Sequence, residues 1–238
     1  MKHPKTAQQV KTLFSRVAKR YDFLNHLLSG GVDYYWRGFL TQRVKEQFPR
    51  DLLDLATGSG DLLITLRKRK AYQGIGVGGD FCFPMLAVAQ QKGIRELSTA
   101  DAMHLPFQDH SFDAVTISFG YRNVVDRPIA LKEILRVLRP GGFLYLMEFS
   151  HPVVWWKKIY WKYLVEILPV MAQIWGAEVS DYDYLAETIR RFPTQKQLVQ
   201  ELKQSGFEDS FYWDLTGGIV ALHRAHKGLL DPSIKKIF

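Results

Sequence analysis

The centre of the chain alternates short apolar runs with segments in which apolar residues recur at helical spacing. The runs are residues 51–56, 72–80, 96–101, 112–119 and 142–149, and the helical segments between them are residues 61–70, 83–93 and 127–138. Nearly continuous apolar strands that alternate with helices of about 10 to 15 residues are typical of a parallel sheet covered on both faces. The pattern predicts an α/β fold, in which Arg139 to Gly142 ends the third helix.

Outside this core the pattern changes twice. Residues 151–191 form a long aromatic and basic segment, which we interpret as a helical insertion or lid. A helix at 193–207 and a terminal hairpin of 207–215 and 218–225 follow. We expect one domain over residues 1–227. Its parts are a basic helical arm at 1–50, a cofactor-binding core at 51–150, the insertion at 151–191 and the terminal segment at 192–227, before a loose tail at 228–238.

Composition and charge limit the protein class. Hydrophobic residues make up 47% and charged residues 24%, which excludes a disordered or fibrous chain. Residues 1–50 hold ten basic and three acidic side chains, so they carry +7 of the net +8. Such an arm suits nucleic acid, anionic lipid or an anionic ligand, or it is a solvated face. Cys82 is the single cysteine, which favours the cytoplasm. The apolar stretch 153–175 is interrupted by charges and Pro169, so we expect no spanning helix.

A glycine-rich turn follows the first apolar run and precedes a helix. Its residues are Asp54, Thr57, Gly58, Ser59 and Gly60. Glycines let a ligand approach the amides at the helix start, which indicates a nucleotide-like ligand. The dinucleotide fingerprint requires a third glycine, but the chain has Asp61, Leu62 and Leu63 after Gly60. An acidic turn repels pyrophosphate and can hold the amino group or sulfonium region of S-adenosylmethionine, so the turn predicts that cofactor.

Further polar residues follow the next apolar runs. Asp80, with Phe81 after it, is 20 residues beyond Gly60, where a carboxylate can accept both ribose hydroxyls. Asp101 and Ala102 are placed to contact the adenine, and Ser118 ends the fourth run. Because ligands bind at the carboxyl ends of parallel strands, we expect these residues to surround one cofactor. Each aspartate alone can also be a helix cap or a turn former.

Several longer motifs resemble those of the ubiquinone and menaquinone biosynthesis C-methyltransferase family. They are Asp54 to Asp61, Gly79 to Cys82 with Met85-Leu86, Asp101-Ala102 with Leu105 to Phe107, Ser111 to Asp113, Ser118 to Val124, Arg136 to Gly142, Glu148 to Ser150, Tyr21 to Asn25, Leu28 to Gly30 with Trp36-Arg37, Arg191 to Pro193, and Leu215 to His223. The resemblance covers about residues 10 to 227, and the blocks at 119–124 and 216–223 are the more family-specific.

The resemblance implies a class I, Rossmann-like S-adenosylmethionine-dependent methyltransferase fold. Its seven-stranded sheet has an antiparallel last strand and added N-terminal and late helices. It also implies methyl transfer to a ring carbon of a polyprenylated hydroquinone, with Ser59, Asp80, Asp101, Ala102 and Ser118 as cofactor positions. Asp33, where many members have His, departs from the family pattern. So do Gly78-Gly79 before Asp80 and the short connection between the first two strands.

Four residues are candidates for catalysis. A quinol carbon becomes a good nucleophile when a neighbouring hydroxyl loses its proton, and Arg122 can stabilise the resulting oxyanion or orient a water. A salt bridge or cap to Asp126 is the structural alternative for Arg122. Asn123 can orient the ring hydroxyl, and Tyr21 and Asp22 come from the arm that we expect to close over the site, although such a pair is as often structural.

The partners follow from the same reading. Trp155, Trp156, Trp161 and Tyr163, interleaved with lysines, form either a core helix or an interfacial helix that rests on the inner face of the membrane and admits a lipid-soluble quinol. No histidines have metal-ligand spacing, so we expect no metal. We expect no nucleic acid, because Ser118 to Tyr121 replaces a base-flipping tetrapeptide. A methyltransferase of RNA or of a small soluble metabolite is the alternative, a non-enzymatic scaffold is a third hypothesis, and a homodimer stays open.

Overall fold

The computed structural model describes residues 29–152, 154–167, 169–170 and 179–229. In this part of the chain a seven-stranded sheet has the strand order β3-β2-β1-β4-β5-β7-β6. The strands are β1 (Leu52–Leu55), β2 (Gly76–Asp80), β3 (Leu97–Thr99), β4 (Phe112–Ser118), β5 (Leu138–Phe149), β6 (Glu208–Leu215) and β7 (Val220–His226). Strands β1 to β5 pair in parallel, and β7 pairs antiparallel with both β5 and β6. The predicted fold class and its antiparallel last strand are therefore confirmed.

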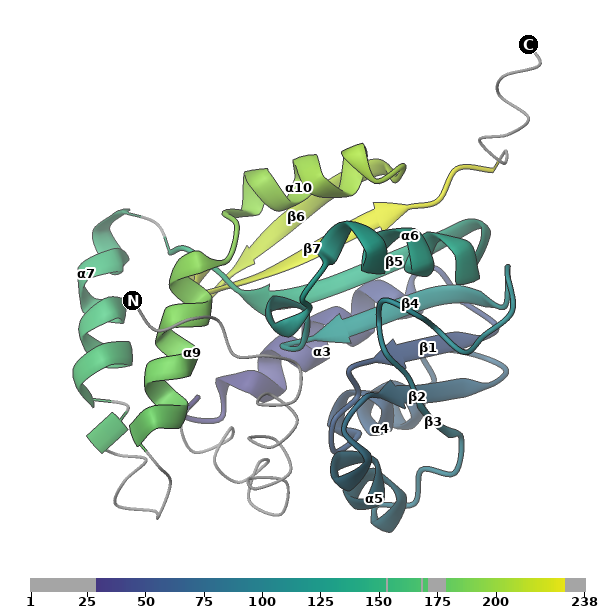
Figure 1. Ribbon diagram of the computed structural model, residues 1–238, viewed down its shortest axis with the longest axis horizontal. Helices are drawn as coiled ribbons and strands as arrows, with labels where there is room; N and C mark the ends of the chain where they lie inside the picture. The colour runs from purple at the N-terminus through teal and green to yellow at the C-terminus, as the bar shows by residue number, and fades with distance from the viewer. Residues whose placement is uncertain (1–28, 153, 168, 171–178, 230–238) are drawn as a thin grey trace.

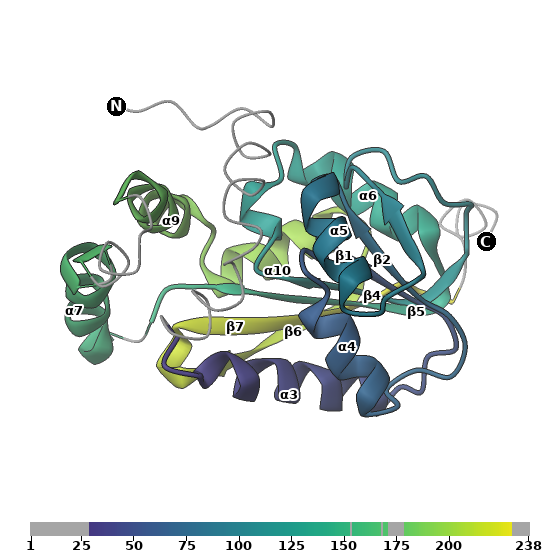
Figure 2. The ribbon, with the colours of Figure 1, turned by 90° about the horizontal axis from the view of Figure 1, so that it is seen from below.

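Helices cover both faces of this sheet (Figures 1 and 2). The helices of the described chain are α3 (Val32–Lys45), α4 (Asp61–Lys68), α5 (Phe83–Gln91), α6 (Arg127–Val137), α7 (Val154–Lys162), α9 (Val179–Arg191) and α10 (Gln195–Gln204). Apolar residues of α6 and α10 join one core cluster, and those of α3, α4 and α5 join another. Neighbouring strand residues divide between the clusters, as Leu52 and Leu53 do, because side chains alternate across a strand.

Strand β5 begins earlier than the sequence pattern predicts. Leu138 follows α6 directly in extended conformation and already pairs with Phe112. Arg139 to Gly142, which were predicted to end the helix, lie inside the strand. The pairing of β4 with β5 is irregular there and resumes at Phe143. Gly141 has a φ of 80°, and its amide donates to the carbonyl of Lys227. A bulge holds the extra residues that a regular ladder cannot.

Segments after β5 pack together beside the sheet (Figure 1). Helix α7 continues into a π-helical turn, Tyr163–Ile167, and α9 packs against that turn. Tyr160, Leu164, Ala186 and Ile189 form their shared core. Within residues 151–191, the described elements are α7, the π-helical turn and α9. No helix in these described ranges is long and apolar enough to span a bilayer.

Candidate functional site

A buried carboxylate, that of Asp54, stabilises the turn after β1. Asp54 is 1% exposed, and its two oxygens accept hydrogen bonds from Thr57 Oγ1 and Thr116 Oγ1, each at 2.7 Å. Burial raises the pKa of the Asp54 carboxyl to about 6, although the two hydroxyls act in the opposite direction. Because both of its oxygens are engaged, Asp54 acts through Thr57 and fixes the shape of the turn.

Two glycines give the turn its conformation. Gly58 and Gly60 have φ angles of 56° and 83°, in the left-handed region that favours glycine. A Cβ on Gly60 would lie 2.1 Å from Ile94 Cδ1, so no larger residue fits there. The Gly60 amide donates to the Thr57 carbonyl, and Ser59 between the glycines is buried. The turn thus enters α4 as the glycine spacing predicts.

Asp80 ties the end of β2 to this turn. Its Oδ2 accepts from the Gly58 amide and its Oδ1 from the Cys82 amide, both at 2.8 Å. The side chain is buried, which raises the pKa of its carboxyl despite these amide donors. Glycine at position 78 permits the approach, since a Cβ there would lie 3.0 Å from Thr57 Cγ2. Close packing against Thr57 therefore explains why this chain has glycine at position 78, where it departs from the family pattern.

A hollow opens at the carboxyl ends of β1, β2 and β4. It is lined by Leu55, Ala56, Phe81, Ala100, Asp101, Ala102, Met103, Ile117, Gly120, Tyr121, Asn123, Val124 and Val125. Asp101 is exposed at its rim, where its carboxylate accepts from the Met103 amide at 2.9 Å. The structure therefore brings Phe81, Asp101 and Ala102 together with Asn123. Ser118 is half-buried at the end of β4.

The segment after β4 places the candidate acceptor residues. Phe119 has a φ of 58°, and Tyr121–Asn123 forms a 3₁₀ turn after it. The Arg122 guanidinium donates to a carboxylate oxygen of Glu148 on β5 at 2.8 Å and to the Phe119 carbonyl. The expected alternative partner, Asp126, instead caps α6 by accepting from the Ile129 amide. Arg122 therefore belongs to a buried ion pair that sequence spacing does not reveal.

Asn123 is held by a residue that the sequence analysis missed. The Tyr184 hydroxyl on α9 donates to Asn123 Oδ1 at 2.9 Å, across 61 positions of sequence. Nearby, the Tyr160 hydroxyl is buried and has no hydrogen-bond partner within the described ranges. The tyrosines of residues 160–184 were the available signal, but periodicity cannot show which of them reaches the sheet. Tyr21 and Asp22 lie outside the described residues.

Asp61, the acidic residue of the turn, forms ion pairs within the protein. Asp61 Oδ1 lies 2.6 Å from Lys92 Nζ, and its Oδ2 lies 3.2 Å from the guanidinium of Arg37. Arg37 also pairs with Asp33 at 2.7 Å, and both are largely buried. These contacts compensate the charge of Asp61, so the missing third glycine, and not this charge, distinguishes the turn from a pyrophosphate-binding one. They also give the unusual Asp33 a structural role.

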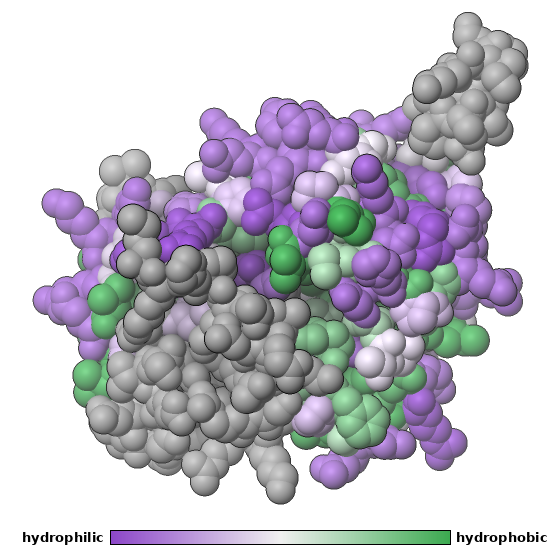
Figure 3. Space-filling view, viewed as in Figure 1, coloured by the Kyte–Doolittle hydropathy of each residue, from purple (hydrophilic) through white to green (hydrophobic). Residues whose placement is uncertain are grey.

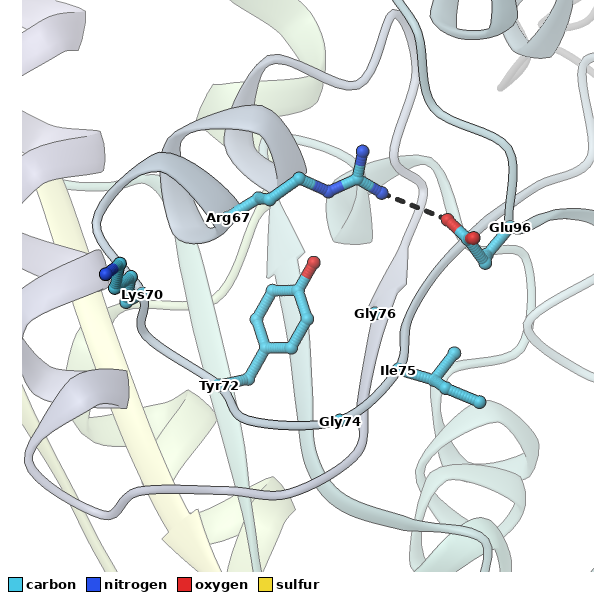
Figure 4. A pocket seen from close by; sticks show the side chains of 7 residues that line it. All are labelled: Arg67, Lys70, Tyr72, Gly74, Ile75, Gly76 and Glu96. Atoms are coloured by element: carbon cyan, nitrogen blue, oxygen red, sulfur yellow. Dashed lines mark hydrogen bonds and ion pairs between the residues drawn. The ribbon is translucent and has the colours of Figure 1, made fainter.

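A second hollow lies at the opposite edge of the sheet, where β2 begins (Figure 4). Arg67 and Glu96 form an ion pair of 3.0 Å there, and Tyr72 fills the space beside Gly76. None of the predicted site residues lines it. The described residues also contain no group of three or more His, Cys, Asp or Glu side chains that could hold a metal ion.

Comparison with known proteins decides the family. A model of the ubiE/COQ5 methyltransferase family matches residues 2–227. The chain belongs to this family. A demethylmenaquinone methyltransferase of Paenarthrobacter aurescens is 43% identical over 226 residues, which cover 94% of this chain and 88% of that protein. A ubiquinone/menaquinone biosynthesis C-methyltransferase of Vibrio cholerae is 39% identical over 227 residues, covering 92% and 87%.

Solved structures agree on the fold of this ubiE/COQ5 family member. A Thermotoga maritima methyltransferase, described as a possible histamine N-methyltransferase, matches with a TM-score of 0.64 at 19% identity, over 91% of this chain and 99% of that one. The [4+2]-cyclase SpnF matches with a TM-score of 0.65 at 19% identity, over 95% and 98%. Because a cyclase shares the architecture, the reaction follows from the family and not from the fold.

As a member of this family, the protein is a methyltransferase that uses S-adenosylmethionine. The described residues fit that cofactor. The left-handed glycine turn lets a ligand approach the amides at the start of α4. The hollow beside it is mostly apolar. Asp101 and Asn123 are the lining residues whose side chains carry a carboxylate or an amide group. Asp80 sits where this turn meets the end of β2.

Proposed function

We propose that the protein methylates a ring carbon of a polyprenylated hydroquinone in menaquinone or ubiquinone biosynthesis, with demethylmenaquinol as the first candidate. One observation carries the proposal: the 43% identity, over nearly the whole chain, to a protein named demethylmenaquinone methyltransferase. The more distant relative named for both quinones keeps the benzoquinol as a second candidate. The site supports it, because an apolar hollow with few polar groups suits an aromatic acceptor.

Residues around this hollow would hold the cofactor and orient the acceptor. Ser59, Asp80, Phe81, Asp101, Ala102 and Ser118 would hold S-adenosylmethionine, with Asp54, Thr57, Gly58 and Gly60 shaping the turn. When bound, the cofactor supplies an electrophilic methyl group on a sulfonium. In the net reaction the ring carbon gains this methyl group and loses a proton. Holding the two reactants together supplies much of the acceleration.

Activation of the acceptor is assigned to the segment after β4. Arg122 is a permanent cation, so it favours the deprotonated form of the quinol hydroxyl and can orient a water that takes the proton. Glu148 holds the guanidinium by an ion pair of 2.8 Å, next to the hollow-lining residues Tyr121 and Asn123 in the chain, although Arg122 itself does not line the hollow. Asn123 lines the hollow and would hydrogen-bond the same ring oxygen. Tyr21 and Asp22 remain candidates on the N-terminal arm.

We further propose that the protein reaches its lipid-soluble substrate by resting on the membrane surface. Exposed apolar side chains on α7 and the π-helical turn support this, with Ile159 59% and Val165 48% exposed. Lys157, Lys158 and Lys162 are exposed beside them. In Figure 3, small apolar areas alternate with hydrophilic ones at the left edge, where Figure 1 places α7. Such a surface combines shallow insertion with attraction to anionic lipids.

Methyl transfer to defined acceptors tests the function. The purified protein is incubated with S-adenosylmethionine and a short-tailed demethylmenaquinol kept reduced, and the product is identified by mass spectrometry. A demethylated benzoquinol of equal tail length and total RNA serve as parallel acceptors. Transfer to either quinol supports the proposal and names the ring class. Cofactor binding without transfer to either quinol contradicts it, and label in RNA would favour the alternative activity.

A further inference from the structure

The hydrogen bond between Tyr184 and Asn123 joins helix α9 to the 3₁₀ turn after β4. Asn123 lines the hollow from the 3₁₀ turn after β4, and Tyr184 lies on α9. The Tyr184 hydroxyl donates to Asn123 Oδ1 at 2.9 Å. Burial raises the pKa of Tyr184 while the nearby charge of Arg122 opposes that rise. The hydroxyl therefore keeps its proton and remains a donor at neutral pH.

This bond determines which end of the Asn123 amide is available. An asparagine side chain has one oxygen, which accepts, and one nitrogen, which carries two donor hydrogens. Tyr184 occupies the oxygen. The amide nitrogen makes no hydrogen bond to another residue of the described chain, so it is the end left to donate. A donor at this place fits an acceptor molecule that presents an oxygen, and most strongly one that carries negative charge.

Packing keeps Tyr184 in place. Ala186 and Ile189, further along α9, are buried against Tyr160 and Leu164 of the preceding segment. The same helix contacts the 3₁₀ turn that carries Asn123. Tyr184 is therefore attached to a packed unit of the insertion. A group held by packing and by a second hydrogen bond keeps the geometry that an acceptor requires.

We infer that Tyr184 is a positioning residue for the methyl acceptor: it fixes the Asn123 amide so that its N–H groups donate to the ring oxygen of the acceptor. The inference rests on the proposed function, because it takes the acceptor to be a quinol. It assigns Tyr184 a role through Asn123, without contact to the acceptor itself. Donation to the oxygen favours its deprotonated form, which lowers the pKa of the bound quinol.

The variant Tyr184→Phe tests this positioning role. It removes one hydroxyl and keeps the ring, so the packing of α9 is retained. We expect kcat to fall about 10-fold, the scale of one lost net hydrogen bond, with little change in the KM for the quinol. The acidic limb of the kcat against pH profile should move to higher pH by about half a unit or more. Affinity for S-adenosylmethionine, measured by calorimetry, should differ from that of the parent by no more than about 2-fold.

Tyr160→Phe is the matched control. It makes the same chemical change on the same packed insertion, but the Tyr160 hydroxyl has no partner in the described structure. We expect parent kcat and an unmoved pH profile. A loss in this control equal to that of Tyr184→Phe would mean that any disturbance of the insertion lowers activity, and it would overturn the inference.

Asn123 variants show whether Tyr184 acts through the amide. In an Asn123→Ala background, Tyr184→Phe should cause no further loss, since the group that it positions is gone. Asn123→Asp keeps an oxygen for Tyr184 but loses the donor, so its activity should be as low as that of Asn123→Ala. A full additional loss in the Ala background, or parent activity in Asn123→Asp, would contradict the inference.

The parent protein separates this inference from the proposed function. If it transfers methyl groups to the reduced quinol and Tyr184→Phe does so at the same rate and with the same pH profile, only the positioning role fails. If the folded parent binds S-adenosylmethionine and methylates neither quinol, the proposed function fails and the positioning role falls with it.

Discussion

The Arg122 guanidinium lies 2.8 Å from the Glu148 carboxylate, and the two side chains are only 8% and 1% exposed. A buried ion pair is strongly destabilised when one partner is removed, because the other charge stays buried without compensation. The same arginine is the candidate that favours the quinol oxyanion. Its loss should therefore reduce both stability and catalysis, and the two effects need separate measurements.

Arg122→Ala should lower the free energy of unfolding by about 3 kcal/mol and kcat by about 100-fold, the scale of losing one preorganised donor. Affinity for S-adenosylmethionine should be nearly unchanged. Glu148→Gln is the control: it removes the charge pair and keeps the guanidinium, so stability should fall while kcat falls much less. Urea unfolding and single-turnover methylation measure the two quantities. Equal losses of kcat in both variants would assign Arg122 a structural role only.

Asp80→Ala should weaken S-adenosylmethionine binding by about 1.5 to 3 kcal/mol, the range for lost charge-assisted hydrogen bonds. The structure adds a second reason for the loss, because Asp80 also holds the Gly58 amide of the turn. Asp80→Asn keeps an oxygen for one amide and should lose less. Calorimetry on folded variants measures the affinities, and unchanged binding in Asp80→Ala would remove this residue from the site.

Gly120→Ala should distort the hollow. The new Cβ would lie 2.4 Å from the Cβ of Ala56, so the two turns must separate. We expect a loss of about 1 to 3 kcal/mol in unfolding free energy and weaker cofactor binding. Ala56→Gly should restore much of both in the double variant, since it removes the clashing methyl and suits the φ of 55° at that position. Thermal unfolding of all three variants checks this, and no rescue in the double variant would disprove the contact as the cause.

Asp54 should make stability depend on pH between about 4 and 6. Its pKa is raised from 3.8 to about 6 by burial, so the folded state holds the proton more tightly than the unfolded state. As pH rises through this window the unfolded chain releases the proton first, and the free energy of unfolding falls by at most about 3 kcal/mol. In Asp54→Asn this fall should be absent. Urea unfolding at several pH values is the measurement.

His223 should make stability depend on pH in the opposite direction to Asp54. Burial lowers its pKa from 6.5 to about 4, so below pH 6.5 the unfolded chain takes up the proton first and stability is lost as pH falls. His223→Gln should remove this loss and make the Asp54 effect easier to see. Parallel pH profiles for Asp54→Asn and the parent protein would contradict the assignment to Asp54.

Membrane attachment should be peripheral and sensitive to salt. Flotation should recover the protein with anionic vesicles at low ionic strength, much less at high ionic strength, and little with neutral vesicles. The double variant Lys157→Glu and Lys158→Glu should lose binding while keeping methyl transfer to a short-tailed quinol. Equal recovery with neutral and anionic vesicles, or no recovery with either, would reject the proposal.

Strand positions could be read from the sequence because the central strands are largely buried and most of their residues are apolar or glycine. The start of β5 could not, since Pro140 and Gly141 resemble a helix stop. Their place inside the strand depends on a distant bond between Gly141 and Lys227. Local signals do not contain that information.

The site residues likewise include some that the sequence could place and some that it could not. Gly58, Gly60 and Asp80 follow strand ends, and their spacing along the chain sets their place in space. The contacts of Arg122 with Glu148 and of Asn123 with Tyr184 span 26 and 61 positions. They exist only when β5 and α9 have packed, so the family-like motif after β4 could name the first member of each pair and not its partner.

The place of β7 between β5 and β6 sets an order of events during synthesis. Strands β1 to β5, which carry the glycine turn and Asp80, leave the ribosome first, and β6 follows with no neighbour to pair with until β7 is made. A domain generally folds as a unit, so the sheet is completed only when β7 has been made. Until then β5 lacks its neighbour on that side and β6 has no partner, and these unpaired strand edges are the point at which a stalled nascent chain is most open to aggregation.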